Sequence, residues 1–66
     1  MSVARVTEIT AASPKSFEDA INKGLKRANE TLGQIEGAWV KEMKVVAKGG
    51  KVAEYRVNMK LTFVLN

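Results

Sequence analysis

The chain has 66 residues, of which 45% are hydrophobic, and a formal net charge of +4. It contains no cysteine and no histidine, which excludes disulfides and the usual structural zinc sites as sources of stability. A domain of about 60 residues buries only about 60% of its unfolded surface, so we expect this chain to gain further stability from self-association.

The first predicted elements are a strand and a helix. Residues 3–11, VARVTEITA, are rich in β-branched side chains and are typical of a strand. Ser16 is a favourable N-cap for the helix that follows, Asp19 stands where a capping-box acid would reach back, and Gly33 is a natural C-terminal stop. Apolar or small side chains recur between these ends at the spacing of one buried helical stripe: Phe17, Ala20, Ile21, Gly24, Leu25, Ala28 and Leu32.

The remainder of the chain predicts a β-hairpin, with strands over residues 37–47 and 52–65 and a turn at 48–51. Gly49 and Gly50 supply the positive φ angles that tight hairpin turns require. The last strand alternates between an apolar face (Ala53, Tyr55, Val57, Met59, Leu61, Phe63, Leu65) and a mostly polar one (Glu54, Arg56, Asn58, Lys60, Thr62, Val64). We therefore predict one α+β domain over residues 1–66, of β-α-β-β order, in which one face of a small antiparallel sheet packs on the helix.

Several functional classes are disfavoured by the sequence. It has neither histidine nor cysteine, and it contains no phosphate-binding loop, dinucleotide fingerprint, zinc signature or EF-hand, so we predict that the protein is not an enzyme. The lysines are scattered among acidic residues, which argues against a nucleic-acid footprint. No stretch approaches the roughly 18 apolar residues of a membrane span, and the first residues lack the pattern of a signal peptide. We expect a cytoplasmic protein without nucleic-acid or membrane partners.

Three segments of the chain, taken together, resemble the dodecin family. They are residues 13–21 (SPKSFEDAI), residues 28–32 (ANETL) and residues 50–57 (GKVAEYRV), the last followed by Leu61-Thr62-Phe63. The resemblance covers essentially the whole chain in one register. It implies a hollow homododecamer in which each helix packs outside a curved sheet. It also implies, for many members, a flavin such as FMN or riboflavin held between subunits.

Two positions depart from the pattern of flavin-binding dodecins. Their stacking tryptophan at the start of the second strand corresponds to Gly37 here, whereas Trp39 follows two residues later, on the same strand face but about 7 Å further along. A bulge at Gly37 is one way to shift Trp39 toward the expected place. The glutamine of the last strand corresponds to Arg56, which donates hydrogen bonds but accepts none.

Two functions therefore remain open. In the first, the protein binds and stores a small molecule, a flavin or a related planar aromatic, with Trp39, Arg56 and Gly37 forming an altered site. The competing role for Trp39 is packing in the oligomer interface, and that for Arg56 is a salt bridge to Glu54 or Glu36 of a neighbour. In the second function, the protein is a flavin-free structural shell of the same family that binds calcium through oxygens of several subunits. Candidate donors are Glu18, Asp19, Glu30, Glu36, Glu42 and Glu54, although their spacing in one chain defines no site.

Overall fold

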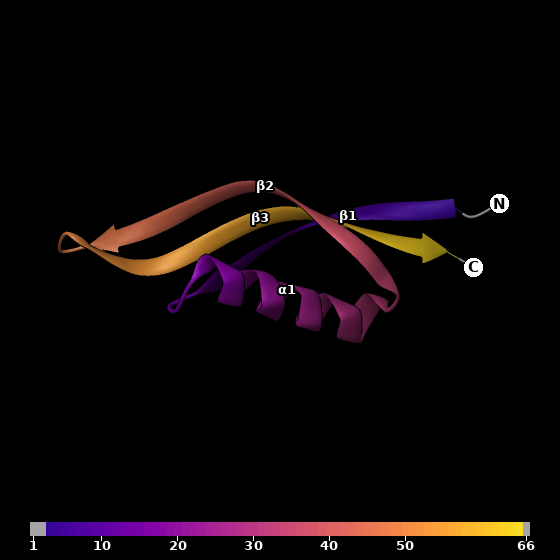
Figure 1. Cartoon of the computed structure of the whole chain (residues 1–66), viewed down its shortest axis with the longest axis horizontal. Helices are drawn as coiled ribbons and strands as arrows, with labels where there is room; N and C mark the ends of the chain where they lie inside the picture. Colours follow the sequence, from indigo (N-terminus) through magenta and orange to yellow (C-terminus); the bar gives the residue numbers. More distant parts are fainter. Residues whose placement is uncertain (1–2, 66) are drawn as a thin grey trace.

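The computed structural model describes residues 3–65, which form four elements in the predicted order: β1 (Val3–Ser13), α1 (Phe17–Leu32), β2 (Ile35–Lys48) and β3 (Lys51–Leu65) (Figure 1). The three strands make one antiparallel sheet in the order β1-β3-β2, so the last strand lies in the middle. The α+β class and the β-α-β-β topology are confirmed. Strands β1 and β2 are each longer than predicted by a few residues.

Both helix ends lie where the sequence predicts them. The Ser16 hydroxyl accepts a hydrogen bond from the backbone N–H of Asp19 at 2.9 Å, as expected of an N-cap. Gly33 has a φ of 67°, and its N–H donates to the Asn29 carbonyl at 3.0 Å. The Asp19 carboxylate has a different role from the predicted capping box: it accepts from the Ser13 hydroxyl at the end of β1 and lies 3.1 Å from Lys23 Nζ. Asp19 thus ties the start of the helix to the first strand.

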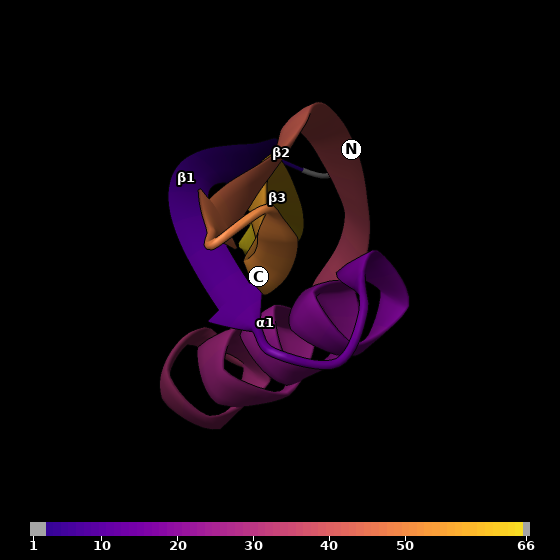
Figure 2. The ribbon, with the colours of Figure 1, turned by 90° about the vertical axis from the view of Figure 1, so that its left-hand side faces the viewer.

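Figure 2 shows end-on that α1 lies against one face of the curved sheet, and the core fills the space between them. Its centre is formed by the alternating apolar side chains of β3 and by the small residues of the helix: Val57, Met59, Leu61, Ala20 and Ala28. Phe17 meets Tyr55 edge to face at the helix start, with ring centroids 5.1 Å apart. The predicted stripe and strand face are confirmed for these residues.

Two side chains depart from the predicted core, and a third lies outside the described part. Ala53 is exposed near the hairpin turn, where a register shift between Val46 and Ala47 leaves it as an extra residue of β3. Leu32 is 42% exposed at the last turn of the helix. The side chain of Leu65 lies outside the described residues.

The chain by itself is elongated and leaves much apolar surface uncovered. Its extents are 51 × 20 × 13 Å and its radius of gyration is 13.5 Å, against about 11 Å for a compact domain of this length. The accessible surface is 4849 Å², against roughly 4,100 Å² for a typical monomer of this mass. Several large apolar side chains are between 42% and 65% exposed: Val3, Val6, Leu32, Trp39, Met43, Val45 and Val52. Within residues 3–65, the helix is neither long nor apolar enough to cross a bilayer.

Candidate ligand-binding face

The sheet surface turned away from α1, here called the open face, carries polar side chains from all three strands. Cross-strand partners share a face, so the register defines this surface. Trp39 of β2 lies opposite Lys60 of β3, which lies opposite Glu8 of β1. The next rows are Glu42, Asn58 and Thr10, and then Lys44, Arg56 and Ala12. The predicted polar character of this face is confirmed.

A bulge inside β2 places Trp39 before it, and Glu42 and Lys44 after it, on the same open face. Trp39 and Val40 continue the register from Gly37, but Lys41 has no partner in β3, and Glu42 resumes the pairing opposite Asn58. Two residues of β2 therefore face one residue of β3, which bends the strand and resets its alternation. Lys41 reaches over the open face, where its Nζ lies 3.6 Å from Glu8 Oε1.

Trp39 is an exposed aromatic platform on this face. Its exposed fraction is 65%, and the ammonium group of Lys60 lies over the ring, 5.6 Å from the ring centroid. A cation at this distance is attracted to the negative face of the indole. The ring is thus positioned by one side chain of β3 and is otherwise open.

The surroundings of Gly37 bear on the predicted shift of Trp39. The sheet has an irregularity next to it, since Glu36 is an extra residue between Ile35 and Gly37. The register then runs without a break from Gly37 to Trp39. The bulge precedes Gly37, so Trp39 keeps its distance of about 7 Å from that position along the strand. A Cβ added at Gly37 would meet no atom of the described residues within 4 Å, so the place of the missing aromatic is open space.

Arg56 lies on the same face as Trp39 but at a distance from it. Its guanidinium pairs with Glu54 of the same chain, and its Cα faces Lys44. Arg56 precedes Lys60, the partner of Trp39, by four residues, which is about 13 Å along a strand. Within one chain the structure therefore brings Gly37 near Trp39 but does not bring Arg56 to either.

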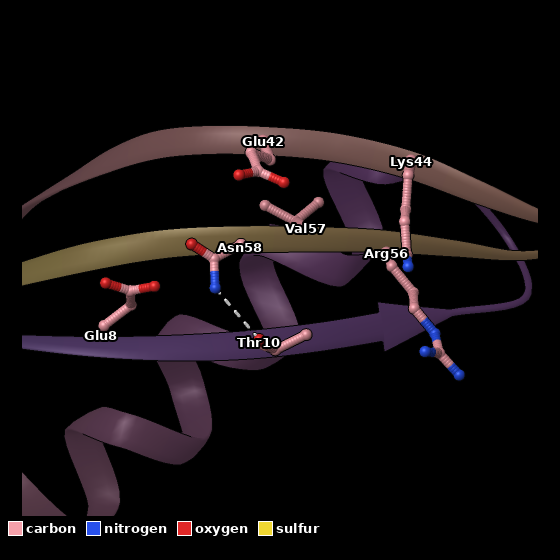
Figure 3. A pocket seen from close by; sticks show the side chains of 7 residues that line it. All are labelled: Glu8, Thr10, Glu42, Lys44, Arg56, Val57 and Asn58. Atoms are coloured by element: carbon pink, nitrogen blue, oxygen red, sulfur yellow. Dashed lines mark hydrogen bonds between the residues drawn. The ribbon is translucent and has the colours of Figure 1, made fainter.

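Arg56 instead borders a shallow hollow of about 350 Å³ on the open face. Figure 3 shows its lining from β1, β3 and β2: Glu8, Thr10, Glu42, Lys44, Arg56, Val57 and Asn58. Asn58 Nδ2 donates to Thr10 Oγ1 at 3.2 Å across the strands. Sequence reasoning missed Glu8, Thr10, Lys44 and Asn58 as site residues. The only sequence signal for them is strand alternation, which does not say which strands are neighbours.

The family model for dodecin matches residues 3–66. The chain belongs to the dodecin family. Its structure is similar to that of the dodecin from Streptomyces davaonensis, with a TM-score of 0.94 and 34% identity over 98% of this chain and 96% of that chain. A mutant of the Thermus thermophilus dodecin gives a TM-score of 0.94 and 30% identity over 100% of this chain and 97% of that chain. A search of the curated proteins finds no match.

Another solved dodecin is a calcium-binding protein, which makes a metal site a second possibility to examine. The calcium dodecin of Mycobacterium tuberculosis, described as calcium-chelating with a novel calcium-binding site, has a TM-score of 0.85 and 28% identity over 98% of this chain and 93% of that chain. Within residues 3–65 of the present dodecin, no three acidic side chains gather into a group that could hold a metal ion. The candidate donors are spread over the fold: Glu18, Asp19 and Glu30 on α1, Glu36 and Glu42 on β2, and Glu54 on β3. Two of them are already paired, Asp19 with Lys23 and Glu54 with Arg56.

Proposed function

We propose that the chain is a non-enzymatic protomer of a hollow, cytoplasmic homododecamer that binds and stores a flavin or a related planar aromatic at an altered site on its open face. The observation that carries this proposal is Trp39, which is 65% exposed on a sheet face that is mostly polar. Burying such a ring against a flat ligand removes apolar surface from water and gains stacking energy.

Self-association is supported by the shape and surface of the single chain. The sheet is longer than the helix that covers it, and the hairpin end extends beyond α1 (Figure 1). Met43 and Val45 are 51% and 44% exposed at that end. An apolar hollow of about 450 Å³ also runs between β1 and α1, beside Ile9, Gly24 and Ala28. Neighbouring protomers of a dodecin-type shell would cover this surface, which a monomer leaves in water.

A site assembled from several protomers is consistent with the distance between Trp39 and Arg56. Because about 13 Å separates the two along the strand, a single flavin ring does not bridge them within one chain. The family resemblance implies that flavin lies between subunits, where Trp39 of one copy and Arg56 of another would meet the same ligand. Arg56 would then donate to carbonyl oxygens of the ring or to an anionic group.

Two measurements test the proposal. Light scattering at micromolar concentration should give a mass about twelve times the protomer's 7.2 kDa, and a mass near 7.2 kDa would refute the shell. Titration with riboflavin or FMN should quench the fluorescence of Trp39, the single tryptophan. A Trp39→Phe variant with tyrosine-only emission serves as the control for inner-filter effects. Colourless protein whose tryptophan emission does not respond to either flavin would refute the ligand class.

A flavin-free shell that binds calcium is the second candidate. It is favoured by the absence of a side chain at Gly37 and by the similarity to the calcium dodecin. Calcium requires several oxygen ligands, and these would have to come from different protomers. Calorimetric titration of the assembled protein with Ca²⁺ distinguishes this function, since saturable binding that persists in excess Mg²⁺ together with no response to flavin would favour it.

A further inference from the structure

Trp39, Lys60 and Glu8 form one row across the three strands of the open face. Lys60 lies between the other two, with Trp39 as its Cα partner in β2 and Glu8 as its Cα partner in β1. A lysine and a glutamate directly opposite each other on neighbouring strands are placed to form an ion pair. Yet the Lys60 ammonium lies over the Trp39 ring, 5.6 Å from its centroid.

The bulge in β2 explains why Glu8 has a different partner. Lys41, the extra residue of that bulge, extends over the open face, and its Nζ lies 3.6 Å from Glu8 Oε1. In the described part of the chain the ion pairs are Lys41 with Glu8, Lys23 with Asp19, and Arg56 with Glu54, and Lys60 belongs to none of them. Lys41 therefore neutralises the carboxylate that stands closest to Lys60 in the register.

Among residues 3–65, Lys60 is thus a cation without a carboxylate partner, held beside an exposed aromatic ring. A cation–π contact at an exposed site is a weaker partner for an ammonium group than a charge-assisted hydrogen bond to an anion. A flat ligand that stacks on the covered face of Trp39 displaces the ammonium from the ring. A ligand that also carries a negative charge gives the displaced ammonium a stronger partner, whereas a neutral ligand gives it none.

We propose that Lys60 is the specificity-determining residue of the Trp39 site and that it selects planar aromatic ligands bearing a negative charge over neutral ones. This inference rests on the proposed function, because it concerns ligands that stack on Trp39. The charge can belong to a phosphate on a side chain of the ligand or to an acidic group on the ring itself. Lys41 supports the selectivity indirectly by keeping Glu8 away from Lys60.

The test is a set of titrations of Trp39 fluorescence in the assembled protein with three probes. Riboflavin is neutral, FMN has the same ring with a phosphate on its side chain, and anthraquinone-2-sulfonate carries its charge on the ring. In Lys60→Gln, the dissociation constant for at least one of the two anionic probes should rise about tenfold, which is the scale of one lost hydrogen bond between charged groups. That for riboflavin should stay the same or fall, since no ammonium has to be displaced. If only FMN loses affinity, Lys60 recognises a negative charge on the side chain of the ligand. If only the sulfonate loses affinity, Lys60 recognises a negative charge on the ring.

Three further variants separate this role from a general effect of charge. Lys60→Arg should retain the preference for the anion. Lys51→Gln removes the same charge at the hairpin turn, nine residues and about 30 Å along β3, and should change no dissociation constant more than twofold. Lys41→Gln leaves Lys60 in place but frees Glu8 to pair with it, so affinity for the anion should fall, and the double change Lys41→Gln with Glu8→Gln should restore it.

The possible results distinguish failure of this inference from failure of the proposed function. If riboflavin and FMN quench Trp39 with equal affinity and Lys60→Gln changes neither, the inference is overturned while flavin binding stands. Equal losses of FMN affinity in Lys60→Gln and Lys51→Gln also overturn it, since they report net charge alone. If no probe quenches Trp39 in the wild-type protein, both the inference and the proposed function are wrong. Light scattering of each variant verifies that the assembly is intact.

Discussion

At Gly24 the helix α1 lies so close to the sheet that a Cβ would clash, and replacement of Gly24 by alanine tests the packing of the fold. A Cβ built at Gly24 would lie 2.7 Å from Met59 Cε, 2.9 Å from Ala11 Cβ and 3.4 Å from Ile9 Cδ1. The Met59 methyl is the end of a flexible side chain and can move. The Ala11 Cβ is fixed to the backbone of β1, so relief of that contact requires the helix or the strand to shift.

Two opposing contributions decide whether Gly24→Ala raises or lowers the free energy of unfolding. Alanine in a helix interior is favoured over glycine by about 1 kcal/mol, whereas overpacking of a close-packed core costs typically about 1–3 kcal/mol. Because one of the two closest atoms cannot rotate away, we expect the packing cost to exceed the gain. The protomer should be destabilised by about 1–2 kcal/mol. Urea unfolding at a fixed protomer concentration measures this effect in an assembled protein.

Matched variants make the result of the Gly24 experiment decisive. Gly37→Ala adds the same methyl group where no described atom lies within 4 Å, so it should leave the unfolding midpoint nearly unchanged. Ala11→Gly combined with Gly24→Ala removes the rigid partner of the clash, and a double-mutant cycle should show positive coupling between the two sites. A Gly24→Ala protein that is more stable than the wild type would show that helix propensity outweighs packing, and the reasoning on close approach would be wrong.

Three further predictions concern the helix start and the altered ligand site. Ser16→Ala should cost about 1 kcal/mol per protomer by removing the N-cap, as measured by thermal unfolding; an unchanged midpoint would contradict the assigned cap. The hydrogen bond from Ser13 lowers the pKa of Asp19 below its ordinary value of 3.8, so the stability it contributes is present above that pH and lost as the pH falls through the lower folded value. Acid unfolding of Asp19→Asn should therefore be less steep than that of the wild type below about pH 4, and identical pH profiles would refute this. Gly37→Trp with Arg56→Gln should strengthen flavin binding by about 1–3 kcal/mol through stacking. A native protein that already binds flavin tightly, loses that binding in Trp39→Ala and gains nothing from the double change would instead place the platform at Trp39.

The fold could be predicted largely from local patterns, because each pattern has a direct physical cause. The recurrence of Ala20, Gly24 and Ala28 on one helix stripe reflects the turn of the helix, and all three are buried. Gly49 and Gly50 adopt φ angles of 60° and 76°, as a tight hairpin turn requires. The extra residue at Ala53 could not be predicted, since a register shift depends on how two strands pair and not on either sequence alone.

The candidate site was predictable only to the extent that strand alternation holds. Alternation places Gly37 and Trp39 on one face, which the register confirms. Strict alternation from Trp39 would put Met43 on that face too, whereas the structure pairs Met43 with Val57 on the side of the helix. The contact of Lys60 with Trp39 and the pair of Lys41 with Glu8 require the strand order and the bulge, neither of which periodicity reveals.

The same bulge connects the fold to the chemistry of the open face. Before Lys41, the odd-numbered residues of β2 face the open side, as Trp39 does, and after it the even-numbered residues do, as Glu42 and Lys44 do. A strand without the bulge would turn Met43 into the polar face and withdraw Lys44 from its place opposite Arg56. With the bulge, β2 keeps the Trp39 ring exposed at one end and aligns its charged residues with those of β3 at the other. The extra residue, Lys41, also forms the ion pair with Glu8. The extra residue is therefore what allows an apolar platform and a charged surface to share one strand.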